Sequence, residues 1–326
     1  MLSLLAWGVF MAAATPLPDI DSLWDYDHPD STQAAFERLL PGARSSGDRD
    51  YLAQLLTQIA RTQGLQMRFD DATRTLDEAE QTLTHETKVA RVRLLLERGR
   101  VLNSSKRREE SKPYFLEAWD LARKIRADRL AVDAAHMLGI VESDDSSIAW
   151  NRKAIAYAEE SDDPKARRWL GSLYNNLGWT YHDQKKDAAT ALDLFQKALA
   201  ARETEGKPDL IRTAHWCVAR ALRTLGRIDE ALAIQRRLLG ENEAANAPDG
   251  YVYEEIGECL LTRHDEAGAK PYFAQAWKIL SEDPWLRRDE PERLERMRQI
   301  GGIALPDSAP APGAAAEGGS GGGTSR

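Results

Sequence analysis

The sequence predicts an all-α fold in which helical hairpins repeat along the chain and stack into a solenoid. Between residues 48 and 283, apolar residues recur at helical spacing, and Gly, Asn, Asp or Pro interrupts them at short intervals. Almost no stretch alternates as a strand would. A small residue also returns at a nearly constant step, and a fixed period of about 20 to 50 residues is typical of a solenoid.

The composition indicates a folded, acidic protein. Hydrophobic residues make up 42% and charged residues 29% of the chain, which excludes a wholly disordered sequence. The net charge of −8 lacks the basic footprint that a phosphate backbone requires, so we expect no nucleic-acid partner. Cys217 and Cys259 form no CxxC pair and have no histidine cluster nearby, which predicts buried thiols rather than a disulfide or a metal site.

Residues 1–18 are predicted to form an apolar N-terminal segment. Residues 2–14 are an apolar run that ends in three alanines and resembles a signal peptide, although the first basic side chain is Arg38. The run is shorter than the roughly 20 residues of a membrane span, so an anchor is the weaker alternative and we expect no stable span. A wrongly chosen start codon is a third interpretation. The segment favours export to a periplasmic location over a cytoplasmic one.

Residues 19–47 are expected to hold a leading cap. Within them, residues 31–40 are predicted to be a helix whose apolar side consists of Ala35, Phe36, Leu39 and Leu40. A repeat array needs such a helix, because an open hydrophobic end face would aggregate.

Residues 48–283 contain the repeats. One small residue marks the first helix of each hairpin, and these residues are Ala60, Gly99, Gly139, Gly178, Ala219 and Gly257. The steps between them are 39, 40, 39, 41 and 38 residues. In the second helices, sets such as Ala191, Phe195 and Ala198 are spaced by four and three residues, which places them on one helix face. The small residues predict a close approach of the two helices, with the aromatic ring filling the space beside them.

These motifs resemble the tetratricopeptide repeat (TPR). The clearest copy has Tyr-Asn-Asn-Leu-Gly-Trp-Thr-Tyr at residues 174–181 and continues at residues 191–199, and a second includes residues 253–257. The family's characteristic turn into its second helix occurs at residues 225–232 and 69–72. The resemblance covers six consecutive copies and implies a right-handed superhelical solenoid of about six TPR-like repeats.

The copies depart from the family pattern in three ways. Their period exceeds the usual length of about 34 residues, which predicts extended second helices or longer connections. The third copy has a shortened turn at residues 143–147, and the fourth carries an extra residue near Asp187.

Residues 284–304 are predicted to form a terminal cap. Asp289, Glu290, Pro291 and Glu292 combine an N-cap, a proline in the first turn and acidic residues that match the helix dipole. The helix that they start is expected to reach about Ile300. Residues 305–326 are Pro/Ala-rich and then Gly/Ser-rich without a periodic apolar face, which predicts a disordered tail.

No motif in the sequence points to catalysis. The six histidines are scattered singly without metal-ligand spacing, and neither a GxGxxG motif in strand and helix context nor a P-loop is present. Adjacent carboxylates such as Asp144 and Asp145 are expected on solvated faces in a chain with 52 acidic residues. We therefore expect no enzyme activity, no metal and no cofactor.

The resemblance implies a protein- or peptide-binding scaffold that uses the concave groove of the solenoid. Residues from the first helix of each hairpin align along this side. Arginines fork to carboxylates, Asn grips extended backbone and Trp anchors apolar groups, so we expect acidic or C-terminal-carboxylate peptides as ligands. The candidate groove residues are Arg61, Arg100, Asn175, Trp179, His182, Trp216, Arg220 and Arg223, within a wider set that includes Arg93, His136 and Ser172.

Two other interpretations stay open. In the first, the groove tryptophans pack between hairpins, and Arg220 and Arg223 pair with acidic residues of a neighbouring helix such as Glu254 and Glu258. In the second, the array is a sensor or accessory protein that binds a small molecule or signalling peptide and changes its oligomeric state. Imperfect caps would also let solenoid ends stack, so self-association is a further expectation.

Overall fold

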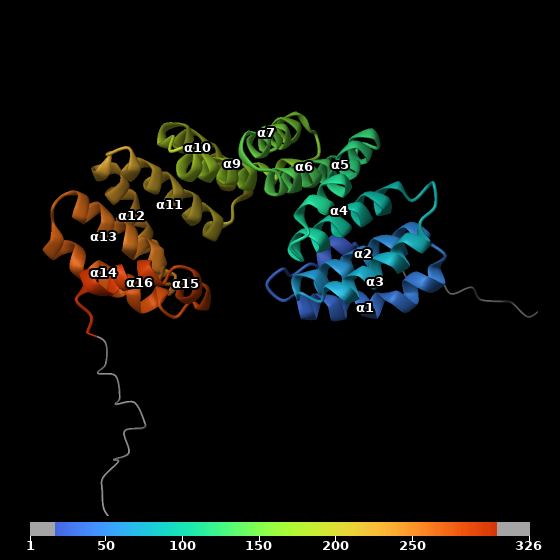
Figure 1. Cartoon of the computed structure of the whole chain (residues 1–326), viewed down its shortest axis with the longest axis horizontal. Helices are drawn as coiled ribbons and strands as arrows, with labels where there is room; N and C mark the ends of the chain where they lie inside the picture. The colour runs from blue at the N-terminus through green and yellow to red at the C-terminus, as the bar shows by residue number, and fades with distance from the viewer. Residues whose placement is uncertain (1–16, 305–326) are drawn as a thin grey trace, which may run out of the picture. The chain divides into compact units, whose positions relative to one another are not determined.

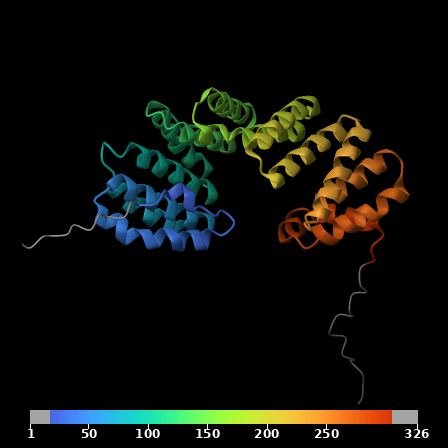
Figure 2. The same cartoon turned by 180° about the vertical axis from the view of Figure 1, so that it is seen from behind.

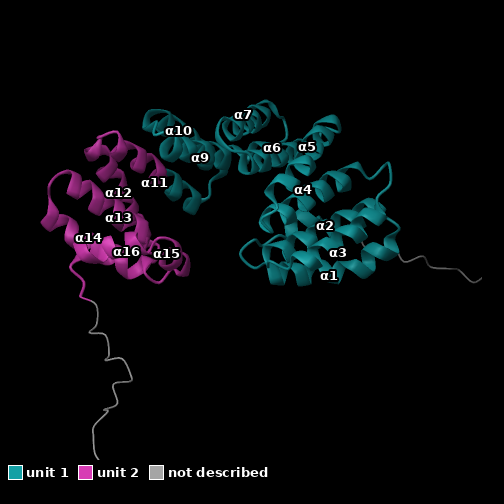
Figure 3. Cartoon of the chain, viewed as in Figure 1, with its two compact units in different colours: residues 1–214 teal, residues 215–326 magenta. Residues whose placement is uncertain are grey.

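The computed structural model describes residues 17–304, and within that range every regular element is a helix (Figure 1). The predicted all-α fold of repeated hairpins is confirmed. The chain divides into two compact units, with the boundary between Ala214 and His215 (Figure 3). The apolar run at residues 2–14 and the tail at residues 305–326 lie outside the described residues. No helix in the described range is long and apolar enough to cross a membrane.

Unit 1 holds four helical hairpins. Its elements are η1 Ile20–Leu23, α1 Pro29–Ser46, α2 Arg49–Leu65, α3 Phe69–Thr82, α4 Lys88–Ser104, α5 Arg108–Lys124, α6 Asp128–Val141, α7 Asp144–Glu160, α8 Pro164–Arg167, α9 Leu170–Trp179, η2 Thr180–Gln184 and α10 Ala188–Glu205. The hairpins pair α2 with α3, α4 with α5, α6 with α7, and α9 with α10. Helix α1 packs beside α2 ahead of the first hairpin. Figures 1 and 2 show this N-terminal part of unit 1 in blue from the front and from behind.

Unit 2 begins within α11 (Pro208–Thr224) and ends with two short helices. It continues through α12 (Ile228–Ala244) and the hairpin of α13 (Gly250–Thr262) with α14 (Glu266–Leu280). Helix α15 (Pro284–Asp289) then precedes α16 (Pro291–Gly301), which packs on α14. Asp289 was expected among the capping residues of the terminal helix, but it ends α15, and Glu290 is the N-cap of α16.

The two helices of a hairpin approach each other closely at the small residue of the repeat. A Cβ atom would lie 2.5 Å from the ring of Phe115 if added at Gly99, 2.6 Å from the ring of Phe195 at Gly178, and 2.7 Å from the ring of Phe273 at Gly257. All three rings are fully buried. The ring therefore occupies the space that a side chain on the glycine would need, as the sequence predicts.

Other residues take the place of the ring in the remaining hairpins. The shortened turn between α6 and α7 brings Asn151 against Gly139, where an added Cβ would lie 2.6 Å from Nδ2. In α12 the corresponding residue is Gln235, which is fully buried. Among the described residues, neither Nε2 nor Oε1 of Gln235 has a hydrogen-bond partner. A buried amide without partners lowers stability, and the equivalent residue in the first hairpin is the buried Leu76.

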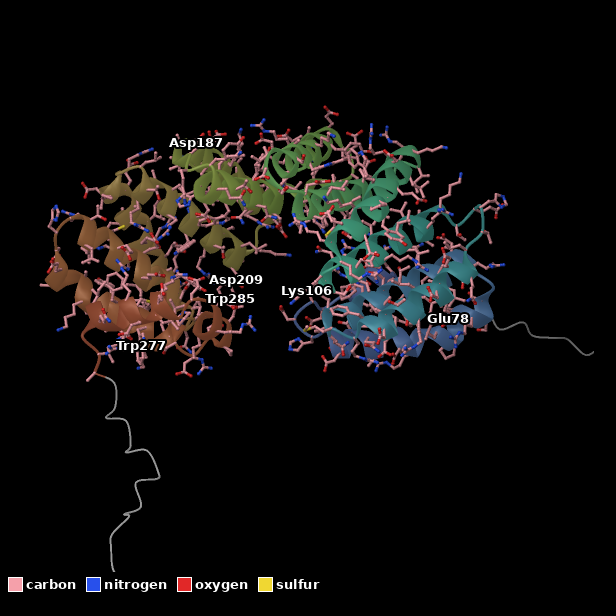
Figure 4. All side chains as sticks on the ribbon, in the orientation of Figure 1. Glu78, Lys106, Asp187, Asp209, Trp277 and Trp285 are labelled. Carbon is pink, nitrogen blue, oxygen red and sulfur yellow. The ribbon has the colours of Figure 1, made fainter. Side chains whose placement is uncertain are left out.

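The fourth hairpin accommodates its extra residue in a π-helix. This π-helix, η2, continues α9, and the N–H of Lys185 donates to the carbonyl of Thr180, five residues earlier, at 3.2 Å. The wider turn takes up the extra residue before the hairpin turn is reached. Asp187, labelled in Figure 4, then caps α10 by accepting the N–H of Thr190 at 3.0 Å. The insertion is therefore absorbed in the first helix, and the contact of Gly178 with Phe195 is kept.

Replacing Gly178 by Ala is expected to lower the free energy of unfolding by about 1–3 kcal/mol, because the added methyl group overlaps the buried ring of Phe195. Combining Gly178→Ala with Phe195→Leu recreates the Ala60 and Leu76 pair of the first hairpin. The double variant should therefore lose less stability than the two single variants together. A double-mutant cycle in urea measures this coupling, and strictly additive losses would contradict the contact.

Replacing Gln235 by Leu is expected to raise the free energy of unfolding by about 1–3 kcal/mol, because it removes a buried amide without partners. Thermal unfolding of the full chain measures the effect. Gln275→Leu on the exposed side of α14 is the matched control and should change stability by less than about 0.5 kcal/mol. A loss of stability in the Gln235 variant would show that this amide is satisfied in solution.

Candidate peptide-binding groove

A cavity of about 650 Å³ in unit 1 runs along the first helices of consecutive hairpins. Its wall includes Gln58 of α2, Arg93 of α4, Arg129 of α6 and Trp169 directly before α9. No residue of a second helix lines it. The cavity therefore lies on the side of unit 1 that the first helices form.

The most buried charges of the cavity form one network. Arg100 donates to Glu97 at 2.6 Å and also pairs with Asp133. Arg61 lies 3.7 Å from Glu97. Burial raises the pKa of Asp133, but the charges of Arg100 and Arg61 and the hydrogen bond from Arg100 act together to hold this pKa below its ordinary value. Two predicted groove residues, Arg61 and Arg100, thus come together here, and carboxylates of the repeats neutralise much of their charge.

The other basic side chains give the cavity wall a positive surplus. The repeats contribute six Arg or Lys side chains to the wall but only two carboxylates, those of Glu97 and Asp133. Four of the six have no carboxylate partner on the repeats within residues 17–304, and these are Arg93, Arg129, Lys165 and Arg168. Of these four, only Arg93 is nearly buried, at 8% exposure, so only there is a missing counter-charge costly. The surplus of positive charge suits the wall to an anionic ligand.

Residues 17–27, which we call the strap, precede α1 and supply the counter-charge. Both carboxylate oxygens of Asp21 accept from Nη2 of Arg93 at 2.8 Å, and Oδ2 also accepts from Nη2 of Arg129 at 2.8 Å. Asp19 lies 4.0 Å from Nζ of Lys165. Burial raises the pKa of Asp21, but the two arginines outweigh burial and hold this pKa below its ordinary value. Asp21 is therefore held as an ionised carboxylate.

Apolar side chains of the strap pack beside these ion pairs. Ile20 is buried in a cluster with Phe36 and Leu55. The indole Nε1 of Trp24 donates to Oε1 of Gln58 at 2.9 Å, and its ring meets Phe36 edge-on with centroids 5.4 Å apart. The strap is thus held by ionic, polar and apolar contacts at once.

Three predicted groove residues lie in the fourth hairpin and do not line this cavity. The ring of Trp179 packs against His182 and Phe195, with centroid distances of 5.3 and 5.0 Å, and lines a second cavity of about 710 Å³. His182 is buried, with Nδ1 2.6 Å from Oδ1 of Asp183. Asn175 is half-buried in α9 and lines neither cavity.

The last three predicted residues lie in unit 2. The indole Nε1 of Trp216 donates to the carbonyl of Tyr251 at 3.2 Å. Arg223 donates to both oxygens of Glu255 at 2.8 and 3.1 Å, and Arg220 pairs with the same carboxylate. The side chain of Glu255 is only 1% exposed. These arginines therefore compensate a buried charge within the fold.

The acidic residues weighed as partners of these arginines pair with the terminal helix instead. Glu254 accepts from Nη2 of Arg293 at 2.6 Å, and Glu258 pairs with Arg296. Both arginines belong to α16, so ion pairs tie this helix to α13. Arg220 and Arg223 therefore do pair with an acidic residue of α13, but this residue is Glu255 rather than Glu254 or Glu258.

Sequence reasoning missed Arg129, Lys165, Arg168 and the whole strap. It placed groove residues by the register of the small residues, whereas these three side chains lie near or before the starts of their helices. A signal was present, because Arg93, Arg129 and Lys165 follow one another at steps of 36 residues. This step is shorter than that of the small residues, so each basic residue lies about one helical turn earlier than in the preceding hairpin.

The side chains that line the cavity are of types that bind ligands through charge, hydrogen bonds and apolar contact. Its wall contains no cysteine and no histidine. Within residues 17–304, no group of three or more His, Cys, Asp or Glu side chains is arranged to hold a metal ion. Arginine, lysine, glutamine and tryptophan can bind a carboxylate and hold an apolar neighbour beside it.

Comparison with known proteins identifies the repeat. Residues 170–205, which cover α9, η2 and α10, match the tetratricopeptide repeat family model. Among curated proteins, none matches the sequence.

Several solved structures have a similar fold. BtubC from P. vanneervenii is 16% identical, with a TM-score of 0.56, over 68% of this chain and 93% of that chain. A signal transduction ATPase with a tetratricopeptide repeat sensor, from Pyrococcus horikoshii, is 14% identical with a TM-score of 0.67, over 83% of this chain and 42% of that chain. Aspartyl phosphate phosphatase F from Bacillus subtilis is 16% identical with a TM-score of 0.50, over 83% of this chain and 77% of that chain. The chain thus carries a tetratricopeptide repeat at residues 170–205 and has the fold of tetratricopeptide-repeat proteins.

Proposed function

We propose that the chain is a protein-binding scaffold and that the cavity of unit 1 binds an acidic segment of a partner protein. The observation that carries this proposal is that the positive wall already holds a carboxylate, that of Asp21, between Arg93 and Arg129. The fold supports the general role, because arrays of this kind offer extended surfaces to partners.

The physical state of the two arginines favours a carboxylate ligand. The side chain of Arg93 is 8% exposed, and charge-assisted hydrogen bonds are strong where water is largely excluded. Arg129 is 27% and Lys165 is 55% exposed. Their charges act at longer range, which speeds encounter with an acidic ligand and makes binding sensitive to salt.

An acidic side chain within a peptide suits this site better than a C-terminal carboxylate. Asp21 reaches both arginines as a side chain, while the main chain continues on either side of it. The proposed ligand therefore carries Asp or Glu inside its sequence.

Replacing Lys165 and Arg168 by Gln together is expected to weaken the binding of acidic peptides about three- to tenfold. Both side chains line the cavity, are exposed and have no carboxylate partner on the repeats, so their loss should leave the fold intact. Fluorescence anisotropy with a panel of Asp-rich peptides and their Asn counterparts measures the change on the full chain.

The matched control for this pair is Lys124→Gln with Lys197→Gln, which removes the same charge from exposed positions on second helices. Equal binding by the two double variants, or equal binding of Asp-rich and Asn-rich peptides, would contradict the proposed function.

Replacing Arg220 and Arg223 by Ala is expected to destabilise unit 2 by about 3 kcal/mol, because it strips a buried carboxylate of its partners. Adding Glu255→Gln should restore part of this loss, since the remaining group is then uncharged. Urea unfolding of the full chain measures both effects. Undiminished stability in the double variant would return Arg220 and Arg223 to the candidate binding residues.

A further inference from the structure

Asp19, Asp21, Ser22 and Tyr26 of the strap form one side of the unit 1 cavity. We propose that this side is displaceable and that the partner segment replaces it by offering the same side-chain pattern. This pattern is an aliphatic residue, an Asp directly after it and a Trp three residues further on. In the strap these residues are Ile20, Asp21 and Trp24. The inference rests on the proposed binding of acidic segments and adds the form of the ligand and the control of access.

The way in which the strap is attached suits exchange. Within residues 17–304, no backbone–backbone hydrogen bond joins the strap to the repeats. Side chains make the polar contacts instead: Tyr51 donates to the carbonyl of Pro18 at 3.0 Å, Gln58 accepts from Trp24, and two arginines hold Asp21. A separate peptide can make each of these contacts without being joined to α1.

The ion pair of Arg93 favours exchange of the strap for another carboxylate over simple release of the strap. Its guanidinium is almost buried, and Asp21 is its only carboxylate partner among the described residues. If the strap left and nothing took its place, Arg93 would lose both hydrogen bonds to Asp21 and keep its charge on the cavity wall. An unpaired charge in such surroundings is unfavourable, so departure of the strap creates a site that demands another carboxylate.

The apolar contacts define the rest of the ligand pattern. Ile20 fills a buried position beside Phe36 and Leu55, and Trp24 combines a hydrogen bond to Gln58 with a ring contact to Phe36. An acidic peptide that lacks these two side chains would satisfy the arginines but leave these positions unfilled. The following strap residues, 25–27, are exposed, and of these Tyr26 also lines the cavity and stacks on Trp24 with ring centroids 4.5 Å apart.

The first test compares three full-length chains: the wild type, Asp21→Asn and Asp27→Asn. The probe is a fluorescent peptide with the sequence of residues 18–25, blocked at both ends. Asp21→Asn is expected to bind it at least about tenfold more tightly than the wild type, because the strap no longer competes for the arginines and apparent affinity follows the open fraction. Asp27→Asn makes the same charge change at an exposed residue that does not line the cavity, and should match the wild type.

The second test observes the strap directly and keeps Asp21. A spin label on Ser22→Cys reports its mobility, and the label is selective because Ser22 is exposed while Cys217 and Cys259 are buried. Adding the peptide is expected to increase the mobility of the label. The same peptide with Asn in place of the Asp that corresponds to Asp21 should leave the mobility of the label unchanged.

Equal peptide affinities for the three chains, with no change in the label, would overturn displacement of the strap. The proposed binding of acidic peptides would still stand in that case, provided that the Asp-rich panel binds the wild type and binds the Lys165→Gln, Arg168→Gln double variant more weakly. Absence of peptide binding to all three chains, together with a panel that shows no preference for Asp over Asn, would overturn both proposals.

Discussion

Close approach of the two helices within each hairpin is the constraint on which the rest of the structure depends. A glycine in the first helix leaves room for a buried ring from the second, as at Gly99 with Phe115 and Gly178 with Phe195. In the third hairpin, Gly139 makes the same close approach to Asn151 in place of a ring. With the hairpins packed in this way, residues of successive first helices come to line the same cavity. The register survives local change: the fourth hairpin absorbs an extra residue in a π-helix and keeps its contact of glycine with phenylalanine.

The source of each arginine's partner separates the charges that are paired within the repeats from those that we propose to bind a ligand. Arg100 is neutralised by carboxylates of the repeats, and Arg223 by Glu255 of a neighbouring helix. These pairs are internal to the array, and removing one partner mainly affects stability. Arg93 and Arg129 differ, because their carboxylate comes from the strap, outside the repeats. Sequence context does not distinguish these arginines, since all four lie in first helices.

A positive cavity in an acidic protein reflects the uneven distribution of charge. The chain carries a net charge of −8, yet the repeats place six basic and two acidic side chains on the cavity wall. Low local dielectric and nearby partners give these few charges more influence on ligand choice than the exposed majority has. Net charge therefore bears on the expectation of no nucleic-acid partner, while the cavity wall bears on the proposed acidic ligand.

The sequence by itself determined the helical class, the period and the pairing of small with aromatic residues, because these depend on spacing along one or two adjacent helices. It also singled out Arg61 and Arg100, which lie in register with the small residues and meet in the cavity. Only the tertiary structure decided the partners of the charges and the place of the strap. The strap has no periodicity, and its Asp21 contacts residues 72 and 108 positions later in the chain. No local pattern encodes a contact at that separation, because it forms only after stacking has brought the first helices of several hairpins to one side.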